Sequence, residues 1–274
     1  MARLPTASLA LLDKWIATLL SIFESVGGLT LLGAHVLRWL QRSLILRQIR
    51  FGFPAAVAQM NRVGVRSIGI VSLVSGSIGI ILALQTSPSL ATFGQIDKVA
   101  NLIAVAVFRE LGPLIAAIVL TGFAGASIAA EIGTMVVGEE IEALEAMALN
   151  PIRFLVVPRV VATTLSLILL SVLSDLMSVI MGCVAGVFFL DIPYELYKQN
   201  TIDQLKLSDF TTGLLKASVF GLILGLIACQ NGMRVTGGAA GVGKATTATV
   251  VQTVVSVVLA DLLFTAIFYA LGWN

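Results

Sequence analysis

A glycine-rich stretch near the C-terminus, GGAAGVGKATT at residues 237–247, has the spacing of a phosphate-binding P-loop. That motif needs two glycines separated by four residues, then Lys, then a Ser or Thr hydroxyl that holds Mg²⁺. Gly238, Gly243 and Lys244 fit, but Ala245 occupies the hydroxyl position. A P-loop also follows a buried strand of an α/β domain, and here the surrounding sequence is apolar. We therefore expect a tight cytoplasmic loop without a nucleotide site, with Lys244 as a topology signal.

Ionisable residues inside apolar segments are the second group of candidates, because charge is costly in lipid and is usually kept there for a function. They are Arg109, Glu110, Glu131, Asp175 and Asp261. Arg109 and Glu110 are adjacent, so on a helix they point about 100° apart and each needs another partner. Arg109 either lines a path for a lipid phosphate or pairs with Asp175 or Asp261 to fix helix packing, and the sequence does not decide between these roles.

The third candidate is an acidic stretch within residues 133–159, GTMVVGEEIEALEAMALNPIRFLVVPR. Its glutamates crowd the first turns of a predicted short helix, where carboxylates suit the positive end of the helix dipole. Ile141, Leu144 and Ala148 form an apolar stripe, and Asn150-Pro151 is expected to end the helix. We interpret it as a cytoplasmic surface helix that docks on a basic partner, with a plain connector as the alternative. The docking residues would be Glu139, Glu140, Ile141, Glu142, Leu144, Glu145, Met147 and Asn150.

Composition indicates an integral membrane protein. Of 274 residues, 58% are hydrophobic and 12% charged, with mean hydropathy +1.01, whereas soluble domains are roughly 45–50% apolar and about 25% charged. The net charge of +2 is too small to argue for nucleic-acid binding. Cys183 and Cys229 lie in apolar runs without metal-site spacing, and no catalytic residues, metal or cofactor are expected on this chain.

Five apolar runs are long enough to cross a membrane, which predicts an all-α membrane protein. They are residues 64–84, 99–130, 158–190, 213–229 and 249–271. The second and third exceed the roughly 20 residues that a bilayer requires, and Gly112-Pro113 supplies a kink in the second. Small residues recur four apart, as in Gly79 and Ala83, which favours close helix packing.

The N-terminal part is expected to lie in the membrane interface. Residues 9–49 are apolar but carry charges and end in an arginine cluster, which suits helices on the cytoplasmic leaflet. A full crossing by residues 15–37 is the alternative, and residues 51–63 add a further interfacial segment. This divides the chain into N-terminal interfacial helices at 1–63 and one membrane domain at 64–274.

Arginines and lysines in the loops predict sidedness. Residues 38–66, 131–159 and 230–248 carry most of the arginines, so we assign their side to the cytoplasm. The other side would hold Lys98, Lys198, Lys206 and Lys216 among acidic residues. Five crossings then place the C-terminus outside.

The run FRELGPLIAAIVLTGFAGASIAAEIGTMVVGEEIEALEAMALNPIRFLVVPRVVA at residues 108–162 resembles the signature region of the MlaE/YrbE permease family. GGAAGVGKATT is similar to the same family's glycine-rich loop before the last helix, and the likeness covers about residues 45–272. The resemblance implies a permease domain at 64–274 in an ABC transporter that moves glycerophospholipids or related lipids between membranes. It also implies that Glu139 to Asn150 form the coupling helix that inserts into the ATPase.

The same resemblance implies the partners and the location. They are a second copy of this chain, a cytoplasmic ATPase dimer that holds the ATP and Mg²⁺, and a periplasmic MCE-domain lipid-binding protein. The membrane would be a bacterial inner membrane, that of cyanobacteria included, or the chloroplast inner envelope. The alternative is an ion-coupled secondary transporter using Asp175, Asp261 and Glu131, although no inverted repeat is found. A membrane enzyme is disfavoured because no intramembrane histidine cluster or nucleophile with a base is present.

Overall fold

A computed structural model describes residues 23–24, 26–42 and 53–272. The chain forms two compact units, and the boundary between them lies between Phe51 and Gly52. In the first unit, Val26–Leu40 is an apolar helix, too short to qualify as a membrane span. Residues 9–22, 25 and 43–49 of the predicted interfacial segment lie outside the described residues. The alternative crossing by residues 15–37 is described only in part, so it stays a prediction.

The second unit is helical throughout and has no strand among residues 53–272. Its helices are α2 (Phe53–Val63), η2 (Val65–Ser67), α3 (Ile68–Thr92), η3 (Ile96–Lys98), α4 (Val99–Ala106), η4 (Val107–Leu111), α5 (Gly112–Leu120), η5 (Thr121–Gly125), α6 (Ala126–Val137), α7 (Glu140–Ala146), η6 (Ile152–Val156), α8 (Val157–Phe189), α9 (Tyr194–Gln204), α10 (Leu207–Met233) and α11 (Gly238–Ala270). Of these, η4, η5 and η6 are π-helical turns, and η2 and η3 are 3₁₀ turns.

Five stretches of the described chain are long and apolar enough to cross a membrane, which confirms the predicted fold class. They are Phe53–Thr92, Ile96–Val137, Ile152–Phe189, Leu207–Met233 and Gly238–Ala270. Each begins before its predicted run, and the first, second and fourth also end after it, because polar and charged residues continue the helices past the purely apolar segments. Residues 238–247 are the clearest case: the GGAAGVGKATT stretch forms the first turns of α11 instead of the predicted loop.

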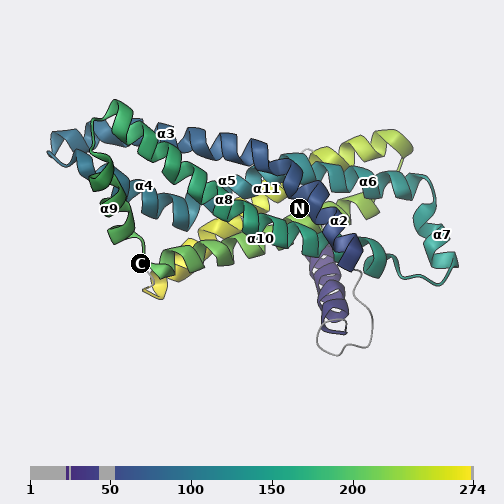
Figure 1. Cartoon of the computed structure of the whole chain (residues 1–274). Coiled ribbons are helices and arrows are strands. Elements are labelled where there is room, and N and C mark those ends of the chain that lie inside the picture. Colours follow the sequence, from purple (N-terminus) through teal and green to yellow (C-terminus); the bar gives the residue numbers. More distant parts are fainter. Residues whose placement is uncertain (1–22, 25, 43–52, 273–274) are drawn as a thin grey trace, which may run out of the picture. The chain divides into compact units, whose positions relative to one another are not determined.

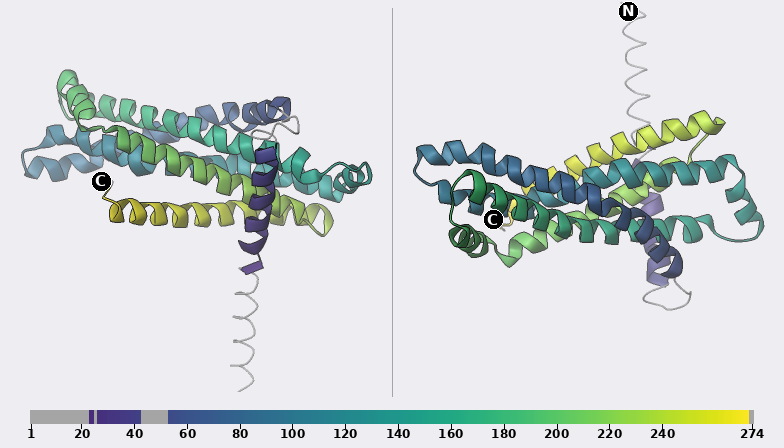
Figure 2. Two further views of the ribbon diagram at one scale, coloured as in Figure 1. Left: turned by 90° about the horizontal axis from the view of Figure 1, so that it is seen from below. Right: turned by 45° about the horizontal axis from the view of Figure 1, so that its top comes forward.

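The long helices run side by side, with α7 at one end and α9 at the other (Figures 1 and 2). At the α9 end, Asn200 Nδ2 donates to the Asp97 carbonyl at 3.0 Å. At the α7 end, Glu131 forms ion pairs with Arg62 and Arg159. Segments predicted to share a side of the membrane therefore do meet at one end of the bundle.

Close contact between α3 and α8 holds the centre of the bundle. A Cβ added at Gly79 would lie 2.9 Å from the Ser178 Cα, so only glycine lets the two backbones approach this closely. Ser75 and Ser174 share a hydroxyl hydrogen bond of 2.7 Å, and the Ser178 hydroxyl donates to the Ser75 carbonyl at 2.9 Å. Such polar contacts and small residues replace the hydrophobic effect, which does not drive helix association within lipid.

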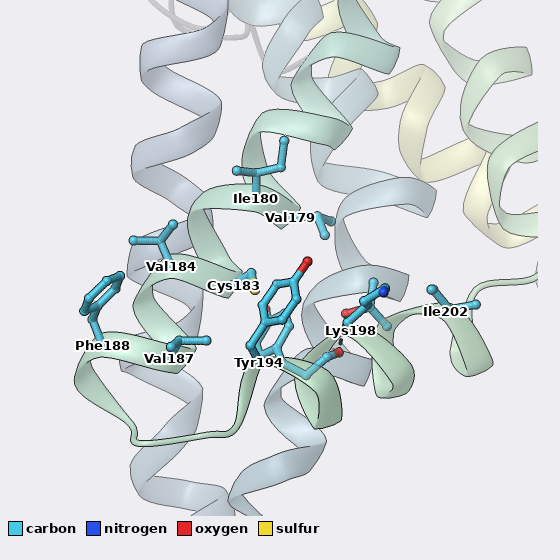
Figure 3. A pocket seen from close by; sticks show the side chains of 11 residues that line it. Val179, Ile180, Cys183, Val184, Val187, Phe188, Tyr194, Lys198 and Ile202 are labelled. Atoms are coloured by element: carbon cyan, nitrogen blue, oxygen red, sulfur yellow. Dashed lines mark hydrogen bonds between the residues drawn. The ribbon is translucent and has the colours of Figure 1, made fainter.

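The short helix α9 folds back onto the end of α8. A pocket of about 370 Å³ lies between the two helices. Its lining includes Val184 and Phe188 from α8 and Tyr194 and Lys198 from α9 (Figure 3). Deeper in the contact, the Tyr197 ring packs over Gly186, with its Cε2 only 2.6 Å from where a Cβ would stand. Tyr197 is fully buried, and its hydroxyl has no hydrogen-bond partner among the residues that the structure describes.

We expect Tyr197→Phe to keep or raise the free energy of unfolding, because no hydrogen bond is lost and the ring contact stays. Tyr197→Ala should lower it by about 3–5 kcal/mol, since a large cavity would open over Gly186. Thermal unfolding of the purified chain in detergent measures both. A destabilised Phe variant would show that the hydroxyl has a structural partner.

Burial also raises the pKa of the Tyr197 phenol above its ordinary value. In the unfolded chain this phenol ionises near pH 10, at about its unperturbed pKa. Above that pH the unfolded state binds fewer protons than the folded one, so the stability of the wild type should fall as pH rises. This component of the loss should be absent in Tyr197→Phe.

Candidate functional site

A charge cluster within the spans is centred on Lys216 of α10, which is 1% exposed. Its ammonium contacts the Glu110 carboxylate on η4 and lies 2.9 Å from the Asp261 Oδ1 on α11. It also donates to the Thr265 hydroxyl at 3.0 Å, and that hydroxyl lies 3.0 Å from the Glu110 Oε1. One buried cation thus joins three separate helical segments through two carboxylates.

A second ion pair lies beside this cluster. The Arg109 Nε lies 2.6 Å from the Asp209 Oδ1, and the Asp209 side chain is 1% exposed. The Asp209 Oδ2 accepts a hydrogen bond of 3.0 Å from the Lys206 backbone N–H, so it also caps the start of α10. The suggested pairing of Arg109 with Asp175 or Asp261 is therefore wrong. Arg109 points to the start of α10, while its neighbour Glu110 points to Lys216.

Sequence reasoning missed Lys216 and Asp209 as members of the charge network. Lys216 was assigned to the loop outside the membrane, although it lies within the predicted run 213–229. Helix α10 begins at Leu207 and includes both Asp209 and Lys216. The signal available was the carboxylate three residues after Lys206, which is the spacing of a helix capping box.

Arg109 and Glu110 both lie in the π-helical turn η4, and their side chains leave it in different directions, as those of adjacent helical residues do. Pro113 lies in the first turn of α5 and has no backbone N–H to donate, which interrupts the regular ladder before it. The extra residue in a π turn changes the direction of the side chains on either side of it. Such turns inside longer helices occur often at functional sites.

Asp175 lies apart from both ion pairs. It is 3% exposed on α8, its Oδ1 has no hydrogen-bond partner, and it forms no ion pair in the described part of the chain. A Cβ at Gly112 would overlap the Asp175 carboxylate, so α5 and α8 approach closely here. Asp175, Asp261 and Glu131 therefore have different neighbours and do not converge on one site.

Glu131 belongs to a third cluster, at the α7 end of the bundle. Its Oε2 lies 2.9 Å from the Arg62 Nη1, and its Oε1 lies 3.0 Å from the Arg159 Nη2. The two arginines come from α2 and α8, so a single carboxylate ties three helices together. Glu131 itself lies on α6, the helix that directly precedes α7 in the chain.

Helix α7 extends beyond that end of the bundle (Figure 1). The four glutamates at 139, 140, 142 and 145 are exposed, whereas Ile141 and Leu144 are half-buried. Glu139 and Ala148 have positive φ angles of 57° and 59° and bracket the helix. Ala148 is therefore outside the predicted apolar stripe, and Leu149 is the next half-buried apolar residue.

The end of α7 also differs from the prediction. The helix ends at Ala146, and the Leu149 N–H returns to the Leu144 carbonyl at 3.0 Å. Asn150 does not end it. Its side-chain oxygen accepts a hydrogen bond of 3.3 Å from the Arg153 N–H, at the start of the next helix.

Five helices long and apolar enough to cross a membrane, with paired charges among them, define a polytopic membrane protein. The family model described as "Permease MlaE" matches residues 56–267, and the chain belongs to this family of ABC transporter permeases. It is 35% identical over 227 residues to a probable ABC transporter permease protein of Rickettsia prowazekii, covering 83% of each chain. It is 32% identical over 250 residues to a probable ABC transporter permease protein of Synechocystis, covering 91% of this chain and 90% of the relative.

A plant relative is also similar. The chain is 33% identical over 215 residues to the chloroplastic protein TRIGALACTOSYLDIACYLGLYCEROL 1 of Arabidopsis thaliana, covering 77% of this chain and 60% of the relative.

Proposed function

We propose that this chain is the membrane subunit of an ABC transporter that moves glycerophospholipids or related lipids, with ATP and Mg²⁺ bound by a separate ATPase. The observation that carries the proposal is the exposed acidic helix α7, held between two spans at one end of the bundle. A membrane subunit without its own nucleotide site needs a surface that receives motion from the ATPase. An acidic helix with half-buried Ile141 and Leu144 suits a basic partner surface.

Lipid as cargo is supported by the family and by the glycerolipid in the name of the plant relative. It is also supported by the Arg109 side chain, which is 25% exposed beside Asp209 and remains accessible to an anionic group. A largely apolar bundle suits acyl chains better than it suits sugars or ions. The cargo would therefore be an amphiphile with a phosphate or similar headgroup.

Two further partners belong to the proposal. Against the described part of the chain, helix α11 buries only Thr249, Thr253 and Val257, so most of its apolar surface is left for a second copy. The α9 end, opposite α7, is where a periplasmic MCE-domain protein would bind. The membrane would be a bacterial inner membrane or the chloroplast inner envelope.

Changing Glu139, Glu140, Glu142 and Glu145 to Lys should abolish docking of the ATPase, because like charges would then face each other. We expect the amount of ATPase that co-purifies with the chain to fall at least about tenfold, one decade of affinity. The measurement is co-purification from native membranes, with the ATPase identified by mass spectrometry and by nucleotide hydrolysis.

The control reverses Glu195 and Asp203 on α9, which are exposed at the opposite end. This variant should retain the ATPase. Equal retention by the α7 and α9 variants would contradict the docking role of α7. Lipid mass spectrometry on the same preparations tests the cargo, and an absence of retained lipid in an assembled complex would contradict that part.

A further inference from the structure

A polar cavity of about 250 Å³ lies at the α7 end of the bundle, between α2 and the segment from η5 to α6. It is lined on one side by Gln59, Arg62 and Arg66 and on the other by Ser127 and Glu131. Apolar surface dominates the rest of the bundle, so a concentration of polar groups at this point needs an explanation.

Several of these groups have no partner among the described residues. Arg66 forms no ion pair or hydrogen bond with any described residue, although Arg62 beside it is paired with Glu131 at 2.9 Å. The Gln59 Oε1 is buried without a hydrogen-bond partner. The Ser127 hydroxyl also forms no hydrogen bond in the described part of the chain.

The charges around the cavity are unbalanced. Glu131 is the one carboxylate among the residues that line the cavity, and it already accepts from Arg62 and from Arg159, which lies outside the lining. Arg66, an exposed residue, lines the same cavity. Excess positive charge therefore remains at Arg66. A guanidinium and a neighbouring hydroxyl together form a donor set that matches the oxygens of a phosphate.

We propose that this cavity is a binding site for an anionic phosphate group, with Arg66 as its principal ligand and Ser127 and Arg62 as further donors. The site is separate from the charge cluster around Lys216, and it does not depend on transport activity. A lipid headgroup and free phosphate present the same chemistry. A lipid is favoured by the position of the cavity at the end of the spans, where headgroups lie.

The test measures binding to the purified full-length chain in a zwitterionic detergent, by isothermal titration with dihexanoyl phosphatidic acid and, separately, with inorganic phosphate. The variants are Arg66→Gln, Ser127→Ala and the control Lys244→Gln, which removes a charge from the exposed start of α11 outside the cavity. We expect Arg66→Gln to weaken phosphatidic acid binding about tenfold, the value of one charge-assisted hydrogen bond. Ser127→Ala should weaken it less, and Lys244→Gln should leave it unchanged.

Thermal unfolding without ligand accompanies each titration, and Arg66→Gln should unfold as the wild type does because Arg66 has no partner to lose. Tight binding of phosphatidic acid alone assigns a lipid headgroup, and equal binding of inorganic phosphate assigns free phosphate. Equal weakening by Arg66→Gln and Lys244→Gln would reduce the effect to general surface charge and overturn the proposal. Absence of binding by either ligand would also overturn it.

Discussion

Replacing Lys216 by Met is expected to lower the free energy of unfolding by about 3–5 kcal/mol, the cost of removing one partner from a buried ion pair. The ammonium is almost completely buried and is shared by Glu110 and Asp261. Without it, both carboxylates would face each other near η4 with no cation between them. We expect a protein that inserts into the membrane but unfolds at a lower temperature.

The matched control is Lys98→Met, which removes an exposed lysine from η3 at the end of the bundle. That change should shift stability by no more than about 0.5 kcal/mol. A triple variant, Lys216→Met with Glu110→Gln and Asp261→Asn, should recover part of the loss because no unpaired charge remains. If Lys216→Met and Lys98→Met unfold at the same temperature, the cluster does not stabilise the bundle.

Gly79→Ala is expected to destabilise the chain by about 1–3 kcal/mol, because the added methyl would overlap the backbone of Ser178. Backbone atoms cannot rotate away as the end of a side chain can, so α3 and α8 would have to separate. The hydroxyl contacts at Ser75 would then lengthen as well. Gly79→Leu should prevent the fold from accumulating.

Gly69→Ala is a matched control on the same helix, because a Cβ there would have no atom within 4 Å. This variant should be as stable as the wild type or gain up to about 1 kcal/mol, since Ala favours the helix. Thermal unfolding in detergent compares the two. A Gly79→Ala variant as stable as Gly69→Ala would contradict the close approach of α3 and α8.

Hydropathy and basic residues were sufficient to predict the five spans and the grouping of their loops at two ends. Both depend on lengths and composition, which are read directly from the chain. The partners of Arg109 and Glu110 could not be predicted, because they depend on how each helix is rotated about its axis. The π turn at η4 changes that rotation locally, and no hydropathy pattern records it.

The misplacement of Lys216 has a related cause. A lysine near the end of an apolar run is usually a loop residue. Its burial requires carboxylates from other helices, and the sequence alone does not show which of them lie beside it in the fold. The glycine-rich start of α11 was also predicted as a loop, because its glycines permit a tight turn and have low helix propensity. Contacts across the bundle decide it: a Cβ at Gly133 on α6 would lie 3.5 Å from the Val242 side chain of α11.

The positive φ angles of Glu139 and Ala148 give α7 a fixed attachment at both ends. The backbone is hydrogen-bonded on both sides of the helix: the Glu139 N–H donates to the Val136 carbonyl at 3.1 Å, and the Leu149 N–H donates to the Leu144 carbonyl at 3.0 Å, so α7 is not joined to its neighbours by slack linkers. A force applied to α7 should therefore pass as a rigid displacement into α6, where Glu131 is tied to α2 and α8. Under the proposed function, Glu131 would be the point at which movement of α7 reaches α2 and α8.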